Sequence, residues 1–490
     1  METKQKSISI NLIANGIKTL MSVLFPLITF PYASRVLGAT GIGKVNYATS
    51  IISYFSMFAA LGIATYAIRE GARIRDDKEK FSKFAKEMLN INLLTTVIAY
   101  VALLIFLCLP ILKNYKILLI ILSGTIVFTT IGMEWLFIIK EEYAYITKRA
   151  VLFQFLSLIL LFLLVRSKED YGWYAALTVI SSGGSAIWNL VYSRKLVNWR
   201  QKITPEYKKH LKPIFLIFGT SIASSIYMTM DTTMLGAMSG DKATGIYTAA
   251  VKINTVVSTL IGTISSTILP RVSYYIGNGL KKEYEKLMQS SMDLLMMVAM
   301  PVAIGMMCTS DILILLFSGA EFLPGSTAAK ILSAKVVIAA INRVLAYQIC
   351  IPYKRDKEVL LSTSGGALFN LIANAALIPI WGVNGASIAT FFSEVVVFII
   401  LFRYTHKYFP VHRLYARGPI YLASSIWFFL CRYILDRVLH NIVVILLATV
   451  AICAAGYFAI LLAIKDPYLK SVVQGAVKRV KKGTGKREEQ

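Results

Sequence analysis

A glycine-rich stretch that occurs twice, LGATGIGKVNYATSI at residues 37–51 and LGAMSGDKATGIYTAAVKI at residues 235–253, decides how this chain is organised. In both copies a Leu-Gly pair ends one apolar run shortly before the next begins. Glycine reaches backbone conformations that other residues avoid, so we expect these glycines to end one helix and turn the chain tightly into the next. A weaker echo joins YGWYAALTVIS at 171–181 with WGVNGASIATFFS at 381–393. The sequence therefore predicts two repeated halves.

The rest of the chain is dominated by long apolar runs. Its 490 residues are 56% hydrophobic and only 16% charged. Because about 18 or more consecutive apolar residues suffice for a membrane helix, the fourteen runs predict an all-α integral membrane protein with about fourteen transmembrane helices. The predicted spans are 11–32, 46–68, 86–109, 116–138, 147–166, 171–193, 213–236, 246–269, 288–317, 331–352, 359–380, 382–404, 418–437 and 441–464.

Six spans fall in each half, so both halves enter the membrane from the same side as parallel repeats. Such parallel repeats are typical of transporters, which bind substrate between the halves. We expect no cleavable signal peptide, because the first apolar run is too long for one. The predicted divisions are an N-terminal six-helix lobe (1–193), a basic cytoplasmic linker (194–212), a second six-helix lobe (213–405), two extra transmembrane helices (406–464) and a basic cytoplasmic tail (465–490).

The net charge of +26 comes mainly from segments that share one side of the membrane in this topology. Positive loops stay in the cytoplasm, so both termini are predicted to be cytoplasmic. The charge is then a topology signal, and we expect no binding to nucleic acid. The basic segments 69–86, 194–212 and 465–487 should face anionic lipid headgroups. The five cysteines and four histidines show no disulfide or metal spacing, and no cofactor is expected.

Residues 38–45, GATGIGKV, match the G-x-x-x-x-G-K pattern of phosphate-binding loops. Val45 stands where such a loop needs Ser or Thr for magnesium, and the second copy of the stretch lacks the Gly-Lys pair. The segment is also predicted to lie outside the membrane, away from ATP. We therefore predict that this segment binds no nucleotide.

Polar residues form stripes at helical spacing on several spans, and a stripe in lipid would be costly unless it faces inward. Lys18 is the strongest signal, because a mid-membrane charge costs roughly 2.5–3.5 kcal/mol on insertion scales and is usually functional or paired. Pro26 and Pro31 should kink the same span. The stripes contain Asn11, Asn15, Lys18 and Ser22; Asn46, Ser50 and Ser53; Thr220, Ser224, Tyr227 and Asp231; Thr248, Lys252, Thr255, Thr259, Gly262 and Ser266; and Lys335, Asn342, Arg343, Asn370, Asn374, Ser387, Thr390 and Glu394.

We expect these stripes to line one central cavity. An alternative for each Ser, Thr or Asn is ordinary helix–helix packing. Lys252 and Asp231 could instead form a structural salt bridge, and Glu134 and Asp293 could simply lie at the membrane interface.

Three segments carry a family likeness. They are LFPLITFPYASRVLGATGIGKVNYATSIISYFSMFAALGIATYAIRE at 24–70, MEWLFIIKEEYAYITKRA at 133–150 and KRDKEVLLSTSGGALFNLIANAALIPIWGVNGASIATFFSE at 354–394. Together they resemble the Wzx-type flippases of the polysaccharide transport family, in the superfamily that also holds the MATE exporters and lipid II flippases. The likeness covers about residues 1–405.

The resemblance implies a flippase that moves undecaprenyl-diphosphate-linked oligosaccharide repeat units to the outer leaflet of the bacterial cytoplasmic membrane, for surface polysaccharide such as O-antigen or capsule. It also implies alternating access through a cationic central cavity, with a glycan polymerase and a chain-length regulator in the same pathway. Arg35 matches the RVLG motif and Glu134 the EW motif. Bases suit a diphosphate, and amides and hydroxyls suit sugars. The candidate substrate-binding residues are Asn15, Lys18, Arg35, Asn46, Asp231, Lys252, Thr255, Lys335, Asn342, Arg343, Asn370 and Glu394.

Two other functions remain open. A MATE-like ion-coupled antiporter of small molecules would need an acidic or aromatic cavity for organic cations, whereas bases equal or outnumber acids within the predicted spans. A membrane enzyme such as a glycan polymerase or ligase would need a substantial outer loop, and the longest predicted outer loop has about a dozen residues. The sequence therefore favours a transporter over an enzyme.

Overall fold

The computed structural model describes residues 8–409 and 417–470, without the side chains of 8–15, 220, 224, 263, 264 and 266. The predicted roles of the Asn11, Asn15, Thr220, Ser224 and Ser266 side chains, and of the tail beyond residue 470, lie outside the described part of the chain.

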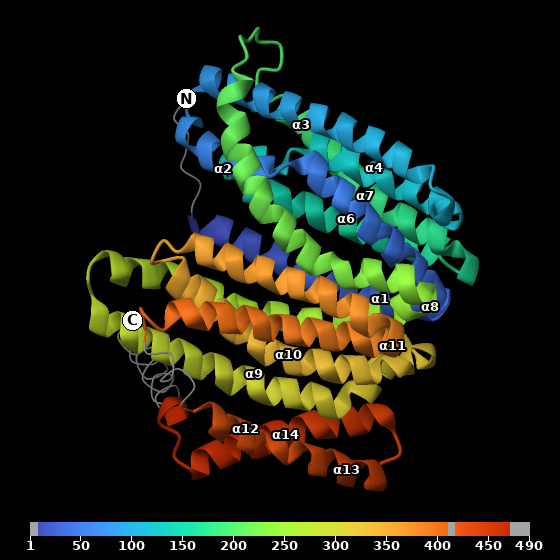
Figure 1. Cartoon of the computed structure of the whole chain (residues 1–490), viewed down its shortest axis with the longest axis vertical. Coiled ribbons are helices and arrows are strands. Elements are labelled where there is room, and N and C mark those ends of the chain that lie inside the picture. Colours follow the sequence, from blue (N-terminus) through green and yellow to red (C-terminus); the bar gives the residue numbers. More distant parts are fainter. Residues whose placement is uncertain (1–7, 410–416, 471–490) are drawn as a thin grey trace, which may run out of the picture. The chain divides into compact units, whose positions relative to one another are not determined.

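Every element in the described residues is helical, as Figure 1 shows in chain order from blue to red. Up to residue 193 the elements are α1 (Ile8–Ala60), α2 (Ile63–Gly71), η1 (Ala72–Ile74), α3 (Lys78–Leu107), η2 (Pro110–Tyr115), α4 (Lys116–Gly132), α5 (Glu134–Ile139), α6 (Tyr143–Leu164), η3 (Lys168–Asp170) and α7 (Tyr171–Ser193).

The remaining elements follow the basic linker. They are α8 (Tyr207–Gly277), α9 (Lys281–Ser318), η4 (Ala320–Gly325), α10 (Ser326–Val344), the π-helix η5 (Leu345–Cys350), α11 (Asp356–Thr405), α12 (Gly418–Ile426), α13 (Phe428–Val438) and α14 (Ile442–Ala463).

The repeated glycines break the long helices, as the sequence predicts. Gly38 of the Leu-Gly pair in α1 has φ 68° and ψ 178°, whereas in α8 the break lies at Gly240 (φ 81°, ψ −177°), four residues beyond the Leu-Gly pair at 235–236. A third break lies at Gly382 in α11, with φ 51°. Side chains rarely tolerate these positive φ values, which explains the glycines. Pro26 and Pro31 lie within α1 without taking it out of helical conformation.

The prediction of an all-α membrane fold is confirmed. In the described ranges, nine helical stretches are long and apolar enough to cross a membrane, and Gly16–Ile74, Ser225–Gly277 and Asp356–Thr405 among them contain a glycine break. The number of fourteen crossings stays a prediction.

Three predicted spans have internal features that apolar composition did not reveal. The span 116–138 is interrupted at Met133, whose left-handed conformation (φ 40°) separates α4 from α5. The span 331–352 ends in the π-helix η5, and the span 418–437 forms two helices that meet at Trp427. Hydropathy averages over such local changes of backbone geometry.

Packing divides the chain into two compact units. The first contains the described residues up to Ala249 together with Phe317–Phe322 and Asn370–Ala386, and the second contains the rest. In the first unit, α1 packs on α3, α4, α6 and α7, and α4 lies along α7. This division follows contacts rather than sequence repetition, so the predicted lobe boundaries stay predictions.

Within the second unit, the C-terminal helices are tied to α9 by polar contacts. Arg417 at the start of α12 pairs with the buried Asp293 at 3.1 Å, and Arg432 of α13 pairs with Asp311 at 3.2 Å. Tyr457 of α14 donates to the Met297 carbonyl oxygen at 2.9 Å. Asp293 is therefore an anchor for α12, and Arg432 is tolerated in an apolar helix because carboxylates face it.

Candidate functional site

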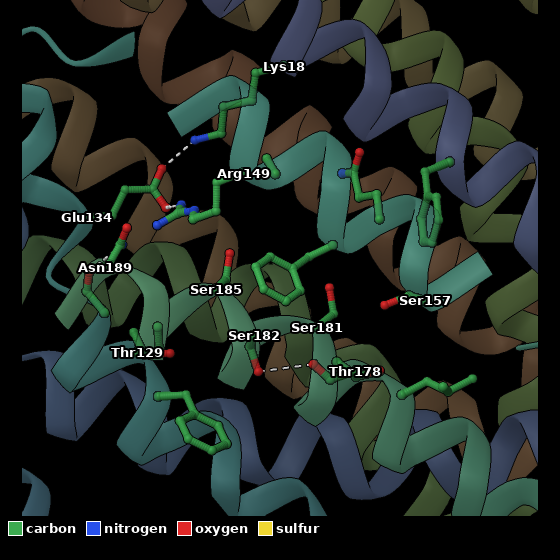
Figure 2. A pocket seen from close by; sticks show the side chains of 18 of the residues that line it. Lys18, Thr129, Glu134, Arg149, Ser157, Thr178, Ser181, Ser182, Ser185 and Asn189 are labelled. Atoms are coloured by element: carbon green, nitrogen blue, oxygen red, sulfur yellow. Dashed lines mark hydrogen bonds and ion pairs between the residues drawn. The ribbon is translucent and has the colours of Figure 1, made fainter. Parts of the chain in front are cut away.

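The first unit encloses a pocket of about 480 Å³ between α1, α4, α5, α6 and α7 (Figure 2). This volume lies in the range of small-molecule sites, roughly 300–1,000 Å³. Apolar side chains such as Phe25, Phe128 and Phe153 form part of the wall. The polar lining residues are Lys18, Thr29, Thr129, Glu134, Arg149, Gln154, Ser157, Tyr174, Thr178, Ser181, Ser182, Ser185 and Asn189.

A charged triad lies at one end of the pocket. Lys18 donates to one oxygen of Glu134, and Arg149 approaches the other at 3.4 Å, as the dashed lines in Figure 2 show. The Arg149 side chain is only 5% exposed, whereas those of Lys18 and Glu134 are 35% and 43% exposed. With two cations and one anion, the charged lining residues sum to +1.

Backbone geometry positions Glu134 in this triad. The left-handed Met133 turns the chain after α4, so that α5 begins at Glu134. Asn189 of α7 donates to the Gly132 carbonyl oxygen at 2.5 Å, and Tyr145 donates to the Asn189 side-chain oxygen at 3.1 Å. Asn189 therefore holds the turn in place and contributes indirectly to the position of the carboxylate.

One face of α7 supplies most of the hydroxyl groups. Thr178, Ser182 and Ser185 follow each other at spacings of four and three, which places them on one side of a helix. Figure 2 shows Ser181 and Ser185 bordering the same space as Ser157 of α6. Hydroxyls on one helix face can donate to and accept from a polar ligand.

Three buried polar atoms at this pocket have no hydrogen-bond partner in the described part of the chain. They are Arg149 Nε, Gln154 Oε1 and Ser157 Oγ. Buried polar groups are nearly always satisfied, so unsatisfied ones need an explanation. Ser157 is only 7% exposed. These atoms give the pocket unused donors and acceptors beside its positive charge.

Most of these pocket residues were not among the sequence candidates. Lys18 was a candidate. Glu134 was matched to the EW motif, with a position at the membrane interface as the alternative. Arg149, Gln154, Ser157 and the α7 hydroxyls were missed. The signal was present, because Thr178, Ser182, Ser185 and Asn189 repeat the 4, 3, 4 spacing of the stripe around Lys18. Serines in membrane helices usually serve packing, so this stripe did not stand out.

A second polar cluster in the first unit brings Asp231 and Asn370 together. The buried Asp231 carboxylate accepts from Tyr247 at 2.7 Å and from Asn374 at 2.6 Å. Asn374 also donates to the Asn370 side-chain oxygen at 3.0 Å. Asp231 thus has neutral partners on both oxygens, and its proposed salt bridge with Lys252 stays a prediction.

Two further pairings lie in the second unit. Asn342 of α10 donates to the Glu394 carboxylate of α11 at 2.8 Å, and both residues are buried. Arg343, the residue after Asn342, is exposed. A methyl group on Gly262 would lie 2.3 Å from the Arg343 Nη1 atom. Gly262 therefore makes room for the Arg343 guanidinium.

The other candidates are not part of these clusters. Arg35 is exposed and donates to the Pro31 carbonyl oxygen at 2.8 Å. Asn46 and Thr255 each bond a carbonyl one turn earlier in their own helix, and Lys252 and Lys335 are half-buried. Of the eleven candidates whose side chains the structure describes, Lys18 alone lines the pocket of the first unit. That all twelve face one central cavity stays a prediction.

The residues that mimic a phosphate-binding loop are helical. Beyond Gly38 the chain continues as α1, so Ala39–Lys44 form no loop around a phosphate. Lys44 lies over the Tyr171 ring at 4.9 Å. This geometry agrees with the prediction that the segment binds no nucleotide.

Comparison with known proteins places this fold among multi-pass membrane transporters. A lipid II flippase, MurJ, in an inward closed conformation superposes with a TM-score of 0.73 over 95% of this chain and 99% of that one, at 15% identity. An inward-facing multidrug resistance MATE family transporter superposes with a TM-score of 0.61 over 82% of this chain and 98% of that one, at 17% identity. Because the sequence identities are this low, the superpositions show that the fold is shared and nothing about function.

Sequence comparison narrows the class to a family. Residues 6–276 match the family described as "Polysaccharide biosynthesis protein", and residues 217–375 match the MatE family. The chain belongs to the polysaccharide biosynthesis protein family. The resemblance stated from sequence motifs is thereby confirmed.

Two curated relatives support this assignment. The "Putative O-antigen transporter" of Escherichia coli K12 is 23% identical over 404 residues, covering 81% of this chain and 96% of the relative. The "Probable low-salt glycan biosynthesis flippase Agl15" of Haloferax volcanii is 22% identical over 213 residues, covering 43% of this chain and 45% of the relative.

Proposed function

We propose that this protein is a flippase that moves polyprenyl-diphosphate-linked oligosaccharide repeat units from the inner to the outer leaflet of the bacterial cytoplasmic membrane. The product would feed surface polysaccharide assembly, with a glycan polymerase and a chain-length regulator acting next. Family membership supports the substrate class, since two relatives carry the names of an O-antigen transporter and a glycan flippase.

The observation that carries the proposal is the chemistry of the first-unit pocket. Its charged lining sums to +1, and Ser, Thr and Gln side chains surround the remaining space. Lys18 and Arg149 suit a phosphate or an acidic sugar, and the α7 hydroxyls with Ser157 and Gln154 suit sugar hydroxyls. At about 480 Å³ the pocket fits part of a glycan while the prenyl chain stays in lipid.

The basic residues of the second half would complete the path. Lys252, Lys335 and Arg343 are proposed to receive the diphosphate as the glycan crosses by alternating access. No covalent chemistry is needed for this movement. A small-molecule antiporter for organic cations fits less well, because the positive lining would repel such substrates.

Complementation of a strain that lacks its own repeat-unit flippase tests this proposal, with surface polysaccharide as the readout. Lys18→Ala and the double change Ser182→Ala with Ser185→Ala should each abolish or strongly reduce surface glycan at normal protein levels. Lys18→Arg should retain partial function, and Lys18→Glu should be worse than Lys18→Ala. Ser326→Ala, an exposed hydroxyl that bonds only its own turn, is the matched control.

The same assay separates a binding role of Lys252 from a structural one. If Lys252 only neutralises Asp231, then combining Lys252→Ala with Asp231→Asn should restore transport, because no uncompensated charge remains. Asparagine retains an acceptor for Tyr247 or Asn374. Wild-type glycan in the Lys18, Ser182/Ser185 and Lys252 variants would overturn the proposal.

A further inference from the structure

A second hollow of the first unit lies where α7 ends, beside the first turn of α3. Its volume is about 1070 Å³, and residues 194–201 of the linker form much of its wall. The charged lining residues are Lys78, Arg194, Lys195, Arg200 and the single acid Glu79, so four cations and one anion sum to +3.

The four cations are available to an outside anion, although Lys195 also lies over the Tyr192 ring, 5.2 Å from its centroid. In the described ranges, no carboxylate forms an ion pair with Lys78, Arg194, Lys195 or Arg200. Each of the four is also exposed. By contrast, nearby Lys83 and Lys209 both pair with Glu206. Holding four unpaired cations around one hollow is unfavourable without a counter-charge.

The wall of this hollow is fixed by hydrogen bonds. The Asn198 backbone N–H donates to the buried Ser82 hydroxyl at 3.0 Å, and Trp199 Nε1 donates to Ser193 Oγ at 3.0 Å. Lys86 donates to the Gln201 carbonyl oxygen. The linker therefore lies against α3 in a defined conformation rather than as a loose chain.

The remainder of the linker is held as firmly. Buried Glu87 accepts from the Glu206 backbone N–H at 2.7 Å and contacts buried His210 at 3.0 Å. Hydrogen bonds and charge from Lys209 and Lys83 lower the pKa of Glu206 to about 2. These contacts fix the part of the linker that follows the hollow.

The surface next to the hollow is apolar and exposed. The last turns of α7 present Ile187, Trp188 and Val191 with exposed fractions of 54%, 48% and 58%, and Leu190 also lines the hollow. On a membrane protein such side chains contact acyl chains, while Trp199 in the hollow suits the interface. The cations thus lie at the headgroup end of a lipid-facing helix.

We propose that this hollow binds the phosphate-bearing headgroup of an anionic phospholipid, with its acyl chains along the end of α7. Arginine offers a fork that matches phosphate, and the lysines add point charge. A soluble phosphate compound would satisfy the cations but would leave the adjoining apolar surface unused. This proposal does not depend on which molecule the protein transports.

Native mass spectrometry of the full-length protein, released from nanodiscs of phosphatidylcholine with or without phosphatidylglycerol, tests the site. Wild-type protein should retain phosphatidylglycerol in preference to phosphatidylcholine. The pocket variant Arg194→Gln, Lys195→Gln, Arg200→Gln should bind phosphatidylglycerol about tenfold or more weakly, since each base near an anionic surface contributes appreciably.

A matched control removes the same charge elsewhere. Lys281→Gln, Lys282→Gln, Lys286→Gln alters three exposed lysines of α9 that are predicted to face the same side of the membrane. This variant should retain wild-type binding. Equal loss in both variants, or no preference for phosphatidylglycerol in wild-type protein, would overturn the site.

The source of the phosphate is tested separately with glycerol 3-phosphate. At millimolar concentration it should not displace phosphatidylglycerol from wild-type protein. Displacement, together with binding of glycerol 3-phosphate that the pocket variant loses, would show a soluble ligand and contradict the lipid proposal.

Discussion

Gly43 of α1 and Gly245 of α8 meet backbone to backbone. A methyl group on Gly43 would lie 1.7 Å from the Asp241 carbonyl oxygen, and one on Gly245 would lie 1.9 Å from the Ala39 carbonyl oxygen. Each glycine follows its helix break, Gly38 or Gly240, by five residues. The two copies of the glycine-rich stretch therefore contact each other reciprocally.

We expect Gly43→Ala and Gly245→Ala each to force this contact apart. Overpacking costs roughly 1–3 kcal/mol or more, and carbonyl oxygens within helices cannot move aside as a side chain can. Thermal unfolding of the purified protein should show a lower Tm, and complementation should show reduced surface glycan. Gly172→Ala is the control, because a methyl group there meets nothing within 4 Å. Wild-type stability of Gly245→Ala would contradict the close approach.

The triad of Lys18, Glu134 and Arg149 should lose stability unequally when its members are removed. Glu134→Ala leaves the buried Arg149 unpaired, with a cost toward the lower end of roughly 3–5 kcal/mol because the Glu134 side chain is 43% exposed. Lys18→Ala leaves the Glu134–Arg149 pair intact and should cost less. Chemical or thermal unfolding in detergent measures the order. The reverse order would show that Lys18, rather than Arg149, is the main partner of Glu134.

Gly262→Ala should act through Arg343. The added methyl group would lie 2.3 Å from Arg343 Nη1, so the guanidinium must move. If Arg343 contributes to transport, surface glycan should fall in Gly262→Ala and in Arg343→Ala. The double change should be no worse than Arg343→Ala alone, because both remove the same function. Gly305→Ala, with open space around it, should behave as wild type. If the losses of surface glycan add in the double variant, Gly262 and Arg343 act independently.

Lys44→Ala should leave transport largely intact. Lys44 is half-buried and loses its contact with the Tyr171 ring, and such contacts are worth about 0.5–2 kcal/mol between exposed and desolvated sites. Purified wild-type protein should show no ATP hydrolysis. An ATP-dependent activity that disappears in Lys44→Ala would restore the nucleotide interpretation of residues 38–45.

Reporter fusions test the predicted topology. Fusions after Lys209, Arg355 and Gln490 should report a cytoplasmic location, because basic segments stay inside. Fusions near Lys113 and Asp241 should report an outer location. A cytoplasmic signal at Asp241 would contradict both the number of crossings and the parallel repeat.

The sequence by itself determined the class of fold and its internal repetition. Apolar runs of membrane-spanning length depend only on neighbouring residues, so they are readable without a structure. A break in each glycine-rich stretch was predictable for the same reason, because a positive φ demands glycine locally, although the Leu-Gly pair marks its position at Gly38 and not at Gly240. The family likeness lay in continuous motifs and was equally visible.

Only the tertiary structure decided which polar residues meet. Lys18 and Glu134 are 116 positions apart, and helical spacing fixes the face on which a residue lies but not the helix opposite that face. The sequence therefore indicated that Lys18 is functional or paired, but not that its partner is Glu134. The hydroxyl face of α7 was not predicted from the sequence. Likewise it explained Gly38 but not Gly43, since a glycine that admits another backbone is recognised only when that backbone is in place.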